Sequence, residues 1–310
     1  MRARLNFSAS RIKRRQTLLG LAFASPFILG ALVFIAYPVL ASAWYSFTDF
    51  NLFQDPKFVG LENYQHMFVD TTFWKSLGNT LYLTLLGVPL TIVISLAGAH
   101  FLNMPIRGQP LYRALVYLPT IVPVVVGGYL WRWLLNSQYG FVNYFLELLH
   151  LPQPEWLEQP DWGKPAILMM CLWTIGGTMI IYLAAIKDVP EELYEAAQLD
   201  GAGWFSRFRY VTWPTVSPVT LFQVIVTMIA YLQIFTQPYL LTQTRLNAAS
   251  GGPGESMISY AMYLFQNAFV FLEMGYASAM AWVLFLVTLA ITLVLLKTSR
   301  RWVHYDSERD

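Results

Sequence analysis

The chain has 310 residues, of which 56% are hydrophobic and only 12% are charged. Average globular domains carry about 25% charged residues. This chain therefore lacks the polar side chains that would cover a soluble protein of its size, and lipid is the expected solvent. The net charge of +2 indicates no general affinity for nucleic acid. The single cysteine, Cys171, excludes an intrachain disulfide and a metal site made of cysteines.

Six apolar segments are long enough to span a membrane as helices, which takes about 20 residues each. They cover residues 18–42, 78–101, 113–135, 165–187, 215–242 and 276–297. Helices are expected because lipid cannot satisfy the hydrogen bonds of irregular backbone. An outer-membrane barrel would instead show alternating strands of about ten residues. The predicted fold is therefore all-α, an integral membrane protein with six transmembrane helices.

Lysine and arginine are distributed unevenly between the segments that connect these spans. With an even number of spans both termini lie on one side, and that side holds 15 of the 20 basic residues. The other five are Lys57, Lys75, Arg132, Lys164 and Arg245. Because basic residues concentrate in cytoplasmic segments, we expect both termini to be cytoplasmic.

This topology divides the chain into five parts. They are a basic cytoplasmic N-terminus (1–17), a first transmembrane helix (18–42), an extracytoplasmic loop (43–77), a core of five transmembrane helices (78–297) with a cytoplasmic loop at 188–213, and a cytoplasmic tail (298–310). The N-terminus also resembles a cleavable signal peptide, but its apolar stretch is longer than the roughly 7–15 residues of such peptides. An uncleaved first span is therefore expected.

Prolines recur in or beside the spans, and charged residues are nearly absent from the interior of the spans. The prolines indicate either ordinary kinks or helices broken along a path through the membrane; they are Pro26, Pro38, Pro89, Pro119, Pro123, Pro214 and Pro218. Ion-coupled transporters usually bury a carboxylate or a histidine inside the membrane. His100 lies at the inner end of the second span and is expected to be interfacial. No phosphate-binding loop, H-E-x-x-H or G-x-S-x-G motif occurs. We therefore expect a non-catalytic membrane protein whose energy for uphill transport enters from another polypeptide.

The most acidic run of the chain, EELYEAAQLDGAGWF at 191–205, falls on the predicted cytoplasmic side between the fourth and fifth spans. Pro190 suits a first helical position, Glu191 and Glu192 suit a helix N-terminus, and Gly201 and Gly203 suit a helix end. A solvated connector is the alternative. A helix that presents small alanines between carboxylates suits insertion into a groove on a partner protein.

The pattern Glu195-Ala196-Ala197-x-x-x-Gly201 resembles the EAA motif of binding-protein-dependent ABC importer permeases. The wider string IPEELYEAAxxDGA, here with Val189 in place of isoleucine, is similar to the sugar-permease branch that includes maltose and glycerol-3-phosphate permease subunits. The resemblance covers nearly the whole chain, since five other stretches agree: FVGLENY (58–64), NTLYLT (79–84), YLPTIVP (117–123), GGP (251–253) and GYASAMAW (275–282).

The resemblance implies a type I ABC importer permease fold in the cell inner or plasma membrane. It makes the acidic helix a coupling helix that docks into a cleft of an ATPase subunit, with the coupling role assigned to Glu195, Ala196, Ala197, Asp200 and Gly201. It also implies the partners, which are a second homologous permease, two ATPase subunits and an extracytoplasmic solute-binding protein. ATP and Mg²⁺ would be bound by the ATPase subunits, and this chain would need no cofactor of its own.

A sugar site needs hydrogen-bonding groups and an aromatic face, because hydroxyls need partners and pyranose C–H faces stack on rings. The candidates in the fourth and fifth spans are Trp173, Thr174, Gly177, Thr178, Thr227, Tyr231 and Gln233, with Gly176 and Gly177 open to close approach of a ligand. The resemblance to the maltose-type permease places Gly177, Thr227 and Tyr231 at the sugar. Ordinary helix packing is the alternative for all of them.

These observations predict the permease subunit of an ATP-driven importer for a sugar or sugar derivative. On the outer side, the acidic loop residues and the segment Gly251–Glu255 are a candidate docking surface for the binding protein, with solvated loops as the alternative. The acidic residues are Glu147, Glu155, Glu158 and Asp161. The rival function is a stand-alone secondary transporter or channel for a small polar solute.

Overall fold

The computed structural model describes residues 2–243 and 251–304. The chain forms two compact units. The smaller unit comprises Met1–Gln65 with Asn267–Trp282, and the larger unit comprises His66–Gln266 with Val283–Asp310. Three helices, α3 (Glu62–Val69), α14 (Tyr260–Phe269) and α15 (Met274–Ser299), have residues in both units.

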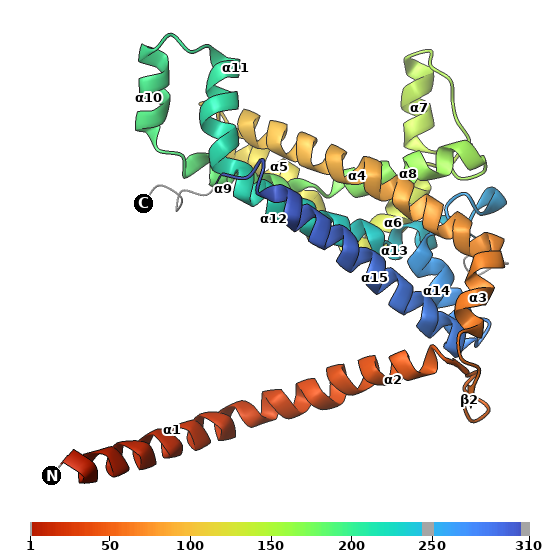
Figure 1. The fold of residues 1–310 in the computed structure, drawn as a ribbon. Helices are drawn as coiled ribbons and strands as arrows, with labels where there is room; N and C mark the ends of the chain where they lie inside the picture. Colours follow the sequence, from red (N-terminus) through yellow and green to blue (C-terminus); the bar gives the residue numbers. More distant parts are fainter. Residues whose placement is uncertain (1, 244–250, 305–310) are drawn as a thin grey trace. The chain divides into compact units, whose positions relative to one another are not determined.

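The smaller unit begins with one long helical stretch (Figure 1). It consists of α1 (Arg2–Ala31), a π-helical turn η1 (Leu32–Ala36) and α2 (Tyr37–Tyr45). A short antiparallel pair of strands follows, β1 (Thr48–Asp49) and β2 (Lys57–Phe58), with Thr48 opposite Phe58. The prediction of an all-α fold therefore needs this one addition, since two residues in each strand pair inside the loop predicted at 43–77.

In the larger unit, α3 (Glu62–Val69) precedes α4 (Thr71–Asn103), which makes its main contacts with four of the helices that follow it in the chain. The others follow in chain order: α5 (Gln109–Ile121), α6 (Val124–Leu134), α7 (Phe141–Leu148), α8 (Pro160–Trp173), α9 (Gly176–Lys187), α10 (Glu191–Leu199), α11 (Trp204–Arg207), η2 (Phe208–Thr212), α12 (Trp213–Leu232), α13 (Thr236–Thr242) and η3 (Pro253–Glu255). The most extensive packing joins α4 to α9 and to α12.

All six predicted spans fall on apolar helical stretches, but only four of these lack a bend of more than 40°. The four are Gln16–Tyr45, Thr71–Asn103, Trp204–Thr242 and Met274–Ser299. The third predicted span bends by 100° between α5 and α6, and the fourth bends by 48° between α8 and α9. The described chain thus has four to six spans, depending on whether each bent pair crosses as one.

Prolines account for part of this irregularity. Val122 is extended (ψ 125°) because the residue before a proline avoids the α conformation, and Pro123 lacks the N–H that would continue α5. Before Pro38 and Pro214 the helix continues through a π-helical turn, in which Tyr37 N–H donates to Leu32 O and Trp213 N–H to Phe208 O. The prediction of broken helices is therefore confirmed at Pro123, whereas Pro89 lies inside the continuous α4.

Small and hydroxylated residues bring these helices close together. A Cβ on Gly98 would collide with Met179 of α9, and one on Gly176 would collide with the backbone oxygen of Val116 in α5. Thr84 and Thr220 are buried and donate to backbone oxygens of their own helices. This is the packing expected of helices in lipid, where apolar burial alone does not hold helices together.

Candidate functional site

The acidic segment forms α10, an isolated helix with a well-defined start and end. Pro190 is the residue before the helix (ψ 132°) and not its first helical residue, so this detail of the prediction was wrong. The helix ends at Gly201, where φ is +78°. Gly201 N–H donates to Gln198 O and Ala202 N–H donates to Ala197 O, which is the Schellman termination that glycine favours. Gly203 is extended (φ −68°) and plays no such part.

Most of the predicted coupling residues face away from the rest of the larger unit. Glu195, Ala196 and Asp200 are exposed and Ala197 is half-buried. Leu199 on the same helix is 90% exposed, which is a large apolar surface to leave open on a surface helix. The exposed face of α10 therefore combines carboxylates, small side chains and an unpaired apolar residue.

Two side-chain contacts attach this region to the spans. Tyr194 on α10 places its hydroxyl 2.8 Å from Thr212 Oγ1, and Thr212 is buried where η2 joins α12. Trp204 Nε1 donates to His100 Nε2 (2.9 Å) near the end of α4, with the two rings edge to face. Figure 1 shows α10 and α11 beside this end of α4, far from α7. His100, predicted to be interfacial, thus holds α11 against α4.

A cavity of about 280 Å³, here called the central cavity, lies among α4, α8, α9, α12 and α13. Of the predicted substrate residues, Thr174, Thr227 and Tyr231 line it, together with Thr178. The Tyr231 hydroxyl lies 3.4 Å from Thr91 Oγ1 of α4. The lining carries hydroxyl and amide groups, one phenol ring and no charged side chain.

The other three predicted substrate residues lie outside this lining. Trp173, the last residue of α8, packs edge to face on Trp131 of α6 and does not line the cavity. Gly177 has open space around it but does not line the cavity. Gln233 follows the last residue of α12 and is exposed.

Three polar residues of the lining were missed, namely Thr91, Gln223 and Gln237. A spacing of four puts Gln223, Thr227 and Tyr231 on one face of α12, and this regularity was visible in the sequence. Gln223 is 3% exposed, and its Nε2 has no hydrogen-bond partner in the described part of the chain. A buried amide without a partner is costly, so a ligand hydroxyl in the cavity would satisfy it.

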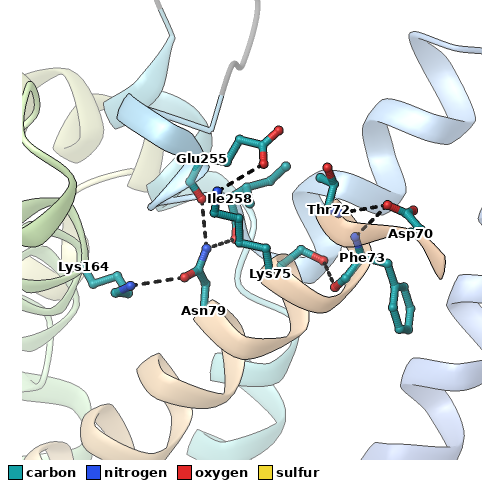
Figure 2. A network of polar contacts seen from close by, with 9 residues as sticks. Asp70, Thr72, Phe73, Lys75, Asn79, Lys164, Glu255 and Ile258 are labelled. Carbon is teal, nitrogen blue, oxygen red and sulfur yellow. Dashed lines mark hydrogen bonds and ion pairs between the residues drawn. The ribbon is translucent and has the colours of Figure 1, made fainter. Parts of the chain in front are cut away.

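A tight turn at Gly251–Ile258 is held against α4 and α8 by a polar network (Figure 2). Asn79 Nδ2 donates to the backbone oxygens of Glu255 and Ile258, both at 3.0 Å, and Asn79 Oδ1 accepts from Lys164 Nζ (3.2 Å). Lys75 forms an ion pair with the Glu255 carboxylate at 3.5 Å. This network fixes the segment predicted to dock a binding protein.

The predicted acidic docking residues Glu147, Glu155, Glu158 and Asp161 are all exposed. Across residues 2–243 and 251–304, no group of three or more histidine, cysteine, aspartate or glutamate side chains could hold a metal ion. The candidate functional features of the described residues are therefore one polar cavity and two surfaces, those of α10 and of the turn at 251–258.

Comparison with known proteins finds one family and many relatives. The family described as "Binding-protein-dependent transport system inner membrane component" matches residues 87–304. A probable ABC transporter permease protein, YesP, of Bacillus subtilis (strain 168) is 38% identical, over 97% of this chain and 96% of the relative. The sulfoquinovosyl glycerol transport system permease protein SmoG of Agrobacterium fabrum is 34% identical over 91% of each chain.

The trehalose/maltose transport system permease protein MalF of Thermococcus litoralis is 32% identical over 95% of this chain and 98% of the relative. Among solved structures, a bacterial ABC transporter involved in the import of the acidic polysaccharide alginate is similar with a TM-score of 0.77. The match covers 94% of this chain and 98% of that one at 24% identity, so it concerns the fold.

Proposed function

The chain belongs to the family of binding-protein-dependent transport system inner membrane components, and from this premise we propose that it is the permease subunit of an ATP-driven importer of a sugar or sugar derivative. The observation that carries the proposal is the similarity, over more than nine tenths of the chain, to permeases named for trehalose/maltose and for sulfoquinovosyl glycerol transport. Its membership also makes it a multi-pass inner-membrane protein with the predicted all-α permease fold.

The chemistry of the central cavity supports a sugar as the cargo. A sugar hydroxyl both donates and accepts hydrogen bonds, and the hydroxyls and amides of the lining do the same. The Tyr231 ring offers an aromatic surface for a pyranose face. Because the lining has no charged side chain, an uncharged polyhydroxyl solute loses less on leaving water than an ion does. Thr174, Thr227, Tyr231 and Gln223 are the proposed sugar contacts.

The exposed face of α10 supports a role in coupling to an ATPase. Glu195 and Asp200 can pair with basic groups of a partner, while Ala196 and Ala197 allow a close approach. The Schellman end at Gly201 turns the chain out of such a groove. In this proposal two ATPase subunits bind ATP and Mg²⁺, and this chain converts their movement into opening and closing of the path without catalysing hydrolysis.

Family membership supports the remaining partners, and the distribution of charge supports the side of the membrane on which each would bind. A second related permease would complete the path, and an extracytoplasmic binding protein would deliver the sugar to the side that carries the turn at 251–258. The excess of basic residues on one side supports a cytoplasmic position of α10 and both termini. The proposed docking surface for the binding protein comprises this turn and the exposed residues Glu147, Glu155, Glu158 and Asp161.

Affinity purification of the chain from its native membrane tests the proposal. We expect two ATPase subunits, a sister permease and a solute-binding protein to copurify, with a sugar bound to the last. A chain that purifies without an ATPase, and transports a solute by itself along an ion gradient, would instead be a secondary transporter or channel.

A further inference from the structure

A second cavity, here called the loop pocket, lies among helix ends and loops of the larger unit. Its volume is about 480 Å³, within the range of about 300–1,000 Å³ typical of small-molecule sites. Its polar walls come from five side chains: Arg132, Asn136, Ser137, Glu158 and Thr242. The pocket is therefore concave, polar and large enough for a small ligand.

Arg132, in the last turn of α6, has no ion-pair or hydrogen-bond partner anywhere in the described ranges, although it is half-buried. The guanidinium carries five N–H donors and no acceptor. A half-buried guanidinium that lines a cavity and has no partner in the described ranges is suited to bind an acceptor group of a ligand.

The same pocket also offers acceptors. Both carboxylate oxygens of Glu158 accept from Ser137 Oγ at 3.2 Å. Glu158 is an exposed residue. Asn136 uses its Oδ1 for the N–H groups of Gln138 and Tyr139, which leaves its amide donors available. An anionic ligand would be attracted by Arg132 and repelled by Glu158. A sugar hydroxyl, which donates and accepts, satisfies both.

The loop pocket lies one helical turn from the central cavity along α13. Gln237 lines the central cavity and Leu241 lines the loop pocket. Residues four apart lie on the same face of a helix and are separated by about 6 Å along its axis. The two cavities therefore share α13 as a wall, and the residues that line them lie one helical turn apart.

The turn of Figure 2 forms another wall of this pocket through Gly252 and Pro253. Gly251 and Gly252 have φ of +75° and Gly254 has φ of +55°, conformations that glycine adopts without strain. Asn79 holds the far end of the turn from α4 by two hydrogen bonds. The wall is thus fixed before any ligand arrives.

We propose that the loop pocket is a second carbohydrate-binding subsite, which holds an uncharged sugar unit between Arg132 and Glu158 before it reaches the central cavity. The inference rests on the proposed function and adds to it a place and a chemical class. Arg132 donates to sugar hydroxyls, Glu158 accepts from them, and Asn79 is a positioning residue that acts through the turn.

Protection of engineered thiols tests this subsite in the assembled importer, purified with its partner subunits in nanodiscs. In a Cys171→Ser background, Ser137→Cys reports on the loop pocket and Val226→Cys on the central cavity. Gln159→Cys is the matched control, because it is exposed and lines neither cavity. The measurement is the rate of labelling by N-ethylmaleimide with maltotriose, arabinotriose or trigalacturonate present.

We expect the two neutral trisaccharides to slow labelling of Ser137→Cys several-fold, with a smaller effect of trigalacturonate and no effect on Gln159→Cys. Adding Arg132→Gln or Glu158→Gln should remove this protection, while the ATPase still copurifies. Unchanged labelling of Ser137→Cys with both neutral sugars would overturn the subsite. Protection by trigalacturonate alone would overturn the uncharged class, and protection by the binding protein without sugar would make the pocket a protein contact.

The Val226→Cys reporter separates failure of this inference from failure of the proposed function. Protection at Val226→Cys without protection at Ser137→Cys would leave sugar transport standing and remove the loop pocket. Protection at neither position would count against both.

Discussion

At the residue scale, the packing of Tyr231 against α4 sets one wall of the central cavity. Tyr231 is buried, and its ring occupies the space that a side chain on Gly87 would need. A Cβ there would lie 2.8 Å from the Tyr231 hydroxyl oxygen and closer still to the ring carbons. Adding a single methyl group at Gly87 would therefore push on the Tyr231 ring, which lines the cavity.

We expect Gly87→Ala to displace the Tyr231 ring and to destabilise the protein by about 1–3 kcal/mol, the usual cost of overpacking. Sugar uptake by the assembled importer should fall with it. Gly78→Ala is the matched control on the same helix, because nothing lies within 4 Å of its added Cβ. Thermal unfolding and uptake measured on both variants check this, and equal behaviour of the two would contradict the packing.

Single residues of the cavity could be predicted only where a regular helix carries them. The helical spacing from Thr227 to Tyr231 places both on one face of α12, and the structure puts both in the lining. Trp173 and Gly177 flank the break between α8 and α9, where a 48° bend changes which side chains face inward. No proline stands at that break, and the glycine pair Gly176-Gly177 is a sequence signal for a kink that does not specify which side chains face inward.

At the element scale, the hydroxyl pair Tyr194–Thr212 is the direct side-chain link from α10 to the helix that lines the central cavity. A hydrogen bond of this kind contributes about 0.5–1.5 kcal/mol. Because η2 and α12 are continuous, we expect a displacement of α10 to be passed through this bond toward Gln223, Thr227 and Tyr231.

Tyr194→Phe and Thr212→Val should each lower the sugar transported per ATP hydrolysed by roughly two- to tenfold, without loss of the copurifying ATPase. The double variant should be no worse than either single one, as expected of residues that act through one contact. Tyr210→Phe is the control, since Tyr210 is 75% exposed in the same loop. Additive losses in the double variant would show that the two hydroxyls act separately.

The exposed face of α10 makes a steric prediction. Ala196→Trp should prevent docking of the ATPase and lower its copurification by about tenfold or more, which corresponds to about 1.4 kcal/mol. Gln198→Trp adds the same bulk about 200° around the helix and should retain the ATPase. Quantitative mass spectrometry of the purified complexes distinguishes the two, and loss in both variants would mean that α10 has simply misfolded.

The turn at 251–258 allows a comparison of buried and exposed contacts. Asn79→Asp keeps the shape of the side chain and its contact with Lys164, but it loses the donors to Glu255 O and Ile258 O. We expect faster amide hydrogen exchange across the turn, because each lost buried bond costs about 1–3 kcal/mol.

Lys75→Met is the control for this turn. It breaks only the ion pair with Glu255. The side chains of Lys75 and Glu255 are 46% and 42% exposed. Exposed pairs contribute about 0–1 kcal/mol, so exchange should change little. An equal effect of the two variants would mean that Asn79 does not hold the turn.

The long helices could be predicted from the sequence, but the bends and π-helical turns within them could be predicted only in part. The apolar windows located the long helices, and glycine at the end of the acidic run located the end of α10. The bend at Val122 and Pro123 follows from proline chemistry. The π-helical turns before Pro38 and Pro214 depend on how neighbouring turns accommodate a missing N–H, which proline alone does not specify.

At the scale of the whole molecule, the composition already indicated a membrane protein. A chain with 12% charged residues lacks the polar side chains that would cover a soluble protein of its size. The cavities could not be derived in this way, because they form between helices far apart in sequence. Thr91 of α4 meets Tyr231 of α12 across the central cavity, and no local pattern predicts that pairing.

ATP-dependent uptake into proteoliposomes tests the central claim most directly. The chain is reconstituted with its copurified permease and ATPase subunits, ATP is enclosed inside, and the binding protein is added outside with the sugar that mass spectrometry identifies on it. We predict uptake of that sugar only when ATP, ATPase subunits and binding protein are all present. Uptake by this chain alone, driven by an ion gradient without ATP, would contradict the account.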